Sequence, residues 1–85
     1  MKEALKKVFM EDLIAFKKTK ESSSEMLLRR KRLMDLMDYI HENFILDDIP
    51  AKAMEAKHAL KSIAFNKELA VEVMDDLECL MNKLY

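Results

Sequence analysis

Glycine is absent from this 85-residue sequence, and proline occurs only once, at Pro50. Tight β-hairpin turns depend on glycine, and so do the glycine-rich loops that hold phosphates. The composition therefore excludes a hairpin-rich β fold and a phosphate-binding loop. It favours one all-α domain spanning residues 1–85, which is an ordinary size for a single domain.

The sequence also has a single cysteine and no long apolar segment. Cys79 is the only cysteine, so no disulfide can form within the chain, as is typical of proteins in reducing compartments. The longest apolar run covers residues 13–16. A signal peptide needs an apolar run of about 7 residues or more, and a membrane span needs about 20. We therefore expect a soluble cytoplasmic protein with no membrane contact.

Charge is balanced overall, at a net −1, but it is unevenly distributed. Residues 1–32 carry 10 basic and 5 acidic side chains, whereas residues 33–85 carry 5 basic and 11 acidic ones. A candidate basic patch comprises Lys17, Lys18, Lys20, Arg29, Arg30, Lys31 and Arg32. Such a cluster can neutralise nucleic-acid phosphates, but no aromatic residue is interleaved for base stacking. Solvation of these cations, or pairing with the acidic residues at 72–78, is the simpler interpretation.

Apolar residues recur at helical spacing in three segments, about 2–19, 23–46 and 50–84. The first stripe consists of Leu5, Val8, Phe9, Leu13 and Phe16. The second consists of Met26, Leu33, Met37, Ile40 and Phe44, widened by Leu36 and Tyr39. Arg30 stands where the spacing of the second stripe expects an apolar residue. Together the segments predict an antiparallel helical bundle.

Two segments carry signals for helix ends. Ser22 and Glu25 fit a capping box at the start of the second helix. Asp47 or Asp48 can cap the third helix, and Pro50 suits its first turn, where the missing N–H costs nothing. These signals set the two helix boundaries that the sequence defines best.

The third segment follows a heptad pattern without a slip. Its core positions are Ala53, Ala56, Leu60, Ile63, Lys67, Ala70, Met74, Leu77, Met81 and Leu84. Only Lys67 is polar. We favour one continuous helix, because a sharp reversal with neither glycine nor proline is difficult to build. The alternative is a break at Asn66, which would cap a fourth helix.

A continuous third helix would be about 51 Å long and would extend beyond a compact domain of this size. Its distal apolar face would need cover from the first helix or from a second copy of the chain. We therefore expect a homodimer. The predicted partner or dimer interface is Ala70, Met74, Leu77, Met81 and Leu84.

No constellation of reactive side chains has strong support. Asp38 with His41, and Glu55 with His58, have the carboxylate-x-x-His spacing of di-iron bundles, but they occupy outer or flanking positions of their helices. Cys79 lies on the outer side of the third helix, with no histidine within helical reach. We predict no catalytic residue, metal, cofactor or small-molecule substrate.

The resulting hypothesis is a non-enzymatic helical regulator that binds another protein or itself. Methionine supports it, because flexible thioethers suit adaptable binding surfaces and this chain has 8 of them. The first alternative is a small nucleic-acid-binding regulator that uses residues 17–32. A further alternative, based on size and helical content alone, is an immunity-type or inhibitor protein of bacterial or phage origin.

Overall fold

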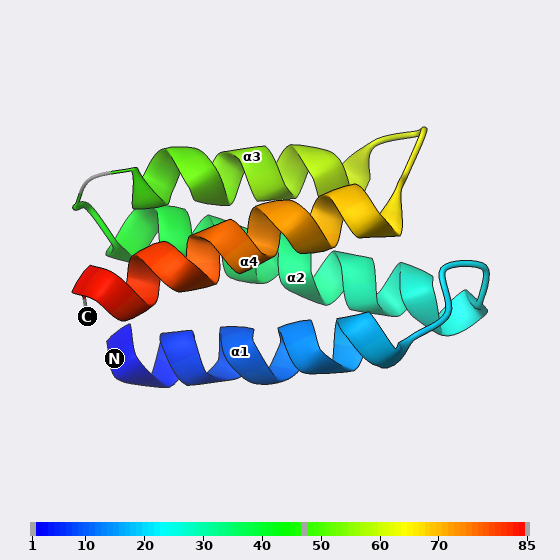
Figure 1. The fold of residues 1–85 in the computed structure, drawn as a ribbon, viewed down its shortest axis with the longest axis horizontal. Helices are drawn as coiled ribbons and strands as arrows, with labels where there is room; N and C mark the ends of the chain where they lie inside the picture. Colours follow the sequence, from blue (N-terminus) through cyan, green and yellow to red (C-terminus); the bar gives the residue numbers. More distant parts are fainter. Residues whose placement is uncertain (1, 47, 85) are drawn as a thin grey trace.

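The computed structural model describes residues 2–46 and 48–84, which form helices and connecting turns without a strand. The helices are α1 (Lys2–Lys18), α2 (Ser24–Asn43), α3 (Ile49–Lys61) and α4 (Lys67–Leu84). They lie antiparallel in a bundle of 34 × 21 × 18 Å (Figure 1). Each helix packs beside the next, and α4 returns to lie beside α1. The prediction of an antiparallel all-α bundle is confirmed.

One apolar core runs through the bundle and receives side chains from every helix. From α1 and α2 it takes Phe9, Leu13, Phe16, Met26, Leu33, Leu36, Met37 and Ile40. From α3 and α4 it takes Ile49, Ala53, Ala56, Leu60, Ala70, Val73, Met74, Leu77 and Met81. Four residues of the predicted stripes are exposed instead: Val8, Tyr39, Ile63 and Leu84. The helical periodicity therefore identified most of the core.

The turn between α2 and α3 begins at Phe44, whose side chain is fully buried and whose N–H donates to the Ile40 carbonyl at 2.9 Å. Asp48 precedes α3, but its side chain makes no capping hydrogen bond. Pro50 lies in the first turn of α3, as predicted. Asp47, the other predicted cap, lies outside the described residues.

The predicted capping box at the start of α2 is wrong. The N-cap is Ser23 rather than Ser22, and it makes no side-chain capping bond. The Ser23 hydroxyl instead donates to the Lys20 carbonyl at 2.8 Å. Glu25 turns toward Arg29, with 3.1 Å between carboxylate and guanidinium, and is thereby unavailable to close the box.

The preference for one continuous helix over 50–84 is also wrong. The chain leaves the helical conformation after Lys61 and re-enters it at Lys67. The side-chain oxygen of Asn66 accepts a hydrogen bond from the Leu69 N–H at 3.1 Å, and its carbonyl accepts one from Ala70 at 3.1 Å. Asn66 is therefore the N-cap of α4, which confirms the alternative of a break at this residue.

Candidate functional site

Arg30 occupies an apolar position of the α2 stripe because its guanidinium binds the end of α3. Its Nε donates to the Leu60 carbonyl at 2.7 Å, and its Nη2 donates to the Ser62 carbonyl at 3.1 Å. The last carbonyls of a helix lack intrahelical partners and carry partial negative charge, so a cation stabilises them. Arg30 thus fixes the point at which α3 ends.

Lys67, the polar residue in the heptad stripe, performs the same task for α1. Its Nζ donates to the carbonyls of Lys17 and Thr19, at 2.7 and 2.6 Å. Its own backbone N–H donates to the Glu21 carboxylate at 3.1 Å. A cation therefore lies at the C-terminal end of α1 and an anion at the N-terminal end of α4, as the helix dipoles favour.

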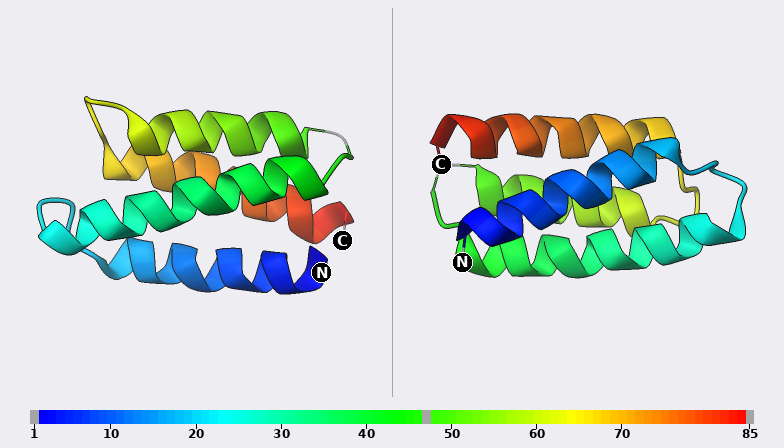
Figure 2. Two further views of the ribbon diagram at one scale, coloured as in Figure 1. Left: turned by 180° about the vertical axis from the view of Figure 1, so that it is seen from behind. Right: turned by 90° about the horizontal axis from the view of Figure 1, so that it is seen from below.

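Phe65, in the turn between α3 and α4, contacts side chains of both α1 and α2. The guanidinium carbon of Arg30 lies 4.1 Å from the centre of its ring. Phe16 meets the same ring edge to face, with 6.2 Å between centroids and 79° between planes. The turns at 19–23 and 62–66 occupy the same end of the bundle (Figure 2). We call this group, Thr19, Glu21, Arg30, Phe65, Asn66 and Lys67, the turn cluster.

Sequence reasoning did not find the turn cluster, although it had noted both of its cations as irregularities in apolar stripes. A charged residue at a core position is retained when its polar atoms find buried partners. Because the last carbonyls of a helix are the commonest unpaired acceptors near a core, that rule points to helix ends as the partners of Arg30 and Lys67. It could not have named the partners, because Arg30 and Leu60 are far apart along the chain.

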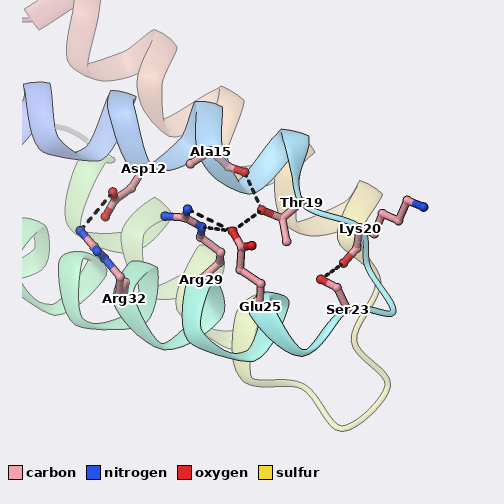
Figure 3. Close-up of polar contacts among 8 residues, drawn as sticks. All are labelled: Asp12, Ala15, Thr19, Lys20, Ser23, Glu25, Arg29 and Arg32. Atoms are coloured by element: carbon pink, nitrogen blue, oxygen red, sulfur yellow. Dashed lines mark hydrogen bonds and ion pairs between the residues drawn. The ribbon is translucent and has the colours of Figure 1, made fainter.

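The predicted basic patch is largely taken up by pairing within the chain (Figure 3). The Arg29 guanidinium lies 3.1 Å from the Glu25 carboxylate, and the Arg32 guanidinium lies 3.4 Å from that of Asp12. Lys17 forms a 2.8 Å ion pair with Asp75 of α4. This last pair joins the basic N-terminal part to the acidic residues of 72–78, as expected.

The remaining lysines of the patch, Lys18, Lys20 and Lys31, have exposed side chains. Lys18, Lys20 and Arg29 line a hollow of about 400 Å³ near the α1–α2 turn. The Glu25 carboxylate lines it as well, and its charge opposes the binding of an anion there. Thr19 closes one side, with its hydroxyl donating to the Ala15 carbonyl at 2.8 Å (Figure 3). The patch is therefore interrupted by acidic groups.

The structure places most of the predicted partner interface inside the chain's own core. Ala70, Met74, Leu77 and Met81 are fully buried. Of that set, only Leu84 is exposed, at 37% of its surface. In this conformation α1 and α3 of the same chain cover the apolar face of α4, so a second chain can reach that face only if α4 leaves its own bundle.

The two carboxylate-x-x-His pairs do not form a common metal site among the described residues. Asp38 forms a 2.7 Å ion pair with Lys57, and Glu55 forms a 3.2 Å pair with Lys52. Among residues 2–46 and 48–84, no group of three or more histidine, cysteine or acidic side chains could hold a metal ion. Cys79 is exposed on α4, as its heptad position indicated. No helix in the same ranges is long and apolar enough to cross a bilayer.

A larger hollow, of about 760 Å³, lies on the outside of α1. The residues that line it are Lys2, Glu3, Lys6, Lys7, Met10, Glu11 and Ile14, and we call this set the α1 outer face. Ile14 is 53% exposed and Met10 is partly buried on this side of the helix. Apolar side chains thus lie among charged ones of both signs.

Comparison with models of known protein families, with curated proteins and with solved structures finds no match to this chain.

Proposed function

We propose that the protein is a non-enzymatic interaction module that binds a protein partner through the α1 outer face and works as a homodimer. The observation that carries the proposal is the hollow on α1, with Met10 and Ile14 among charged side chains. An apolar centre with a charged rim is the common composition of a protein-binding surface. An amphipathic helix of the partner can lay its apolar side chains into such a hollow.

The charges around the hollow favour a protein over a nucleic acid. Lys7 lies among Glu3 and Glu11, so the rim offers partners to both signs of charge. A phosphate backbone requires a surface of one sign. The pairing of Arg29, Arg32 and Lys17 with carboxylates further weakens the nucleic-acid alternative. An inhibitor or immunity-type protein would also act by binding a protein partner through such a surface, and both roles are compatible with this function.

Site-specific photo-crosslinking in the natural host tests the binding surface. A photoreactive amino acid replaces Ile14 in one variant and Leu27 in a control, because Leu27 is comparably exposed on α2. We expect one protein to be cross-linked from position 14 and not from position 27. The purified partner should then bind the Ile14→Asp variant at least ~10-fold more weakly, as for a residue central to an interface.

The control variant Leu27→Asp should bind as tightly as the unmodified chain. Both variants should keep their helical circular dichroism, because both side chains lie outside the core. Equal cross-linking from positions 14 and 27, or unchanged affinity in Ile14→Asp, would contradict the assignment of the α1 outer face.

A further inference from the structure

The heptad pattern continues through the turn that separates α3 from α4. Leu60, Ile63, Lys67 and Ala70 keep the three-four spacing, although α3 ends at Lys61 and α4 begins at Lys67. The intervening residues 62–66 include neither glycine nor proline. Nothing in their covalent structure therefore prevents them from being helical. The local sequence is compatible with two conformations, a turn and a continuous helix.

Contacts made across the bundle hold this segment in the turn conformation. Arg30 binds the Leu60 and Ser62 carbonyls, which would accept hydrogen bonds from backbone N–H groups if the helix continued. Asn66 caps α4 at Leu69. Ile63, in contrast, is fully exposed in the turn, whereas in a continuous helix it would share the face of Leu60 and Ala70. The turn thus leaves one apolar core position of the heptad unused.

α4, the helix that follows this turn, can be exchanged between two copies of the chain. α4 packs against α3 and, less extensively, against α1, while the most extensive contact in the bundle is between α2 and α3. The α4 of a second copy carries the same side chains and can make the same contacts, including the Lys17–Asp75 ion pair. Such an exchange needs no new surface, because it reuses the interface that the monomer already has.

We propose that residues 62–66 are a hinge through which two copies of this chain exchange α4. In the open form α3 and α4 become one helix of about 54 Å, well beyond the 34 Å length of the closed bundle. α4 therefore projects out of its own bundle and packs on α1 and α3 of the second copy. This inference rests on the homodimer of the proposed function and specifies how that dimer forms.

The Lys17–Asp75 pair allows a direct test, because exchange of α4 turns it into a contact between two chains. Chains labelled with ¹⁵N and unlabelled chains are unfolded together, refolded at high concentration and separated by size. The dimer fraction is treated with a carbodiimide, which joins a lysine to an adjacent carboxylate. Mass spectrometry should detect Lys17–Asp75 linked peptides that contain one labelled and one unlabelled half. The monomer fraction should contain only linked peptides of uniform label.

Two variants should shift the dimer in opposite directions. Ile63→Gly removes an exposed side chain from the closed turn but weakens a continuous helix in both copies, so the dimer dissociation constant should rise about tenfold or more. Asn66→Ala removes the α4 cap and adds a strong helix former, so the dissociation constant should fall by a similar factor. Sedimentation equilibrium measures both changes, and circular dichroism checks that each variant is folded.

The experiment distinguishes failure of the α4 exchange from failure of the homodimer itself. A dimer whose Lys17–Asp75 links all have uniform label would overturn the exchange of α4 and leave the homodimer in place. A chain that stays monomeric at every concentration would overturn both the exchange and the homodimer. Cross-linking from Ile14 tests the α1 outer face independently of either result.

Discussion

The turn between α2 and α3 and the turn between α3 and α4 both reverse the chain, but they depend on different parts of the molecule. The first lies next to Phe44, Asp48 and Pro50, which lie within seven residues of one another, and the sequence predicts it. The second carries no glycine or proline. Besides the local cap at Asn66, it depends on Arg30, which reaches it from α2, and on the bonds that Lys67 makes to the end of α1. A chain reversal can thus be specified locally or by tertiary contacts.

The difference has a consequence for stability. A locally specified turn persists when a distant side chain is changed, because the residues that favour it are its own. A turn held from outside loses its support when the distant partner is removed. In dilute, monomeric protein we therefore expect substitutions at the two turns to differ in their effect on stability.

Arg30→Met should have the largest effect. The variant removes both hydrogen bonds to the end of α3 and the contact with Phe65, while keeping an apolar chain of similar length. We expect a loss of about 2–4 kcal/mol in the free energy of unfolding, measured with urea. The neighbouring Lys31 is exposed, and Lys31→Met should stay within about 0.5 kcal/mol of the unmodified chain. Equal effects of the two substitutions would show that Arg30 does not hold the turn.

Lys67→Met should have an intermediate effect. It removes the bonds to the Lys17 and Thr19 carbonyls but places an apolar residue in the heptad stripe, which offsets part of the loss. We expect the free energy of unfolding to fall by about 1–2 kcal/mol. Lys20→Met, at an exposed position in the turn between α1 and α2, is the matched control and should change the free energy of unfolding by less than about 0.5 kcal/mol. A stabilised Lys67→Met variant would contradict the role given to its ammonium group.

Pro50→Ala should have the smallest effect. Proline at this position chiefly restricts the unfolded chain, so its removal should cost about 0.4–1 kcal/mol. The backbone chemical shifts of α3 should still indicate a helix that begins near Ile49. If Pro50→Ala destabilised the protein more than Arg30→Met, the contrast between the two turns would be reversed.

Most of the core was accessible from the sequence because helical periodicity depends only on which positions are apolar. The stripe of Met26, Leu33 and Met37 is buried as predicted. The capping box failed because Glu25 has a competing partner, Arg29, one turn further along the same helix. The sequence predicted a second chain on the apolar face of α4 because a continuous helix would leave that face exposed. In the structure the turn supported from α2 lets the chain's own helices cover it. The α1 outer face went unnoticed because Met10 and Ile14 resemble any apolar residues beside a stripe.

The sequence by itself determined that this protein is helical, where the first two reversals occur and which side chains form most of the core. These properties follow from the absence of glycine, from the apolar spacing and from Pro50, all of which act over a few residues. The tertiary structure decided the number of helices. Residues 62–66 are compatible with a helix or a turn, and the choice depends on Arg30, Phe16 and Lys17, which only folding brings to that end of the bundle. For the same reason, the structure rather than the sequence shows that the apolar face of α4 is covered by the chain itself.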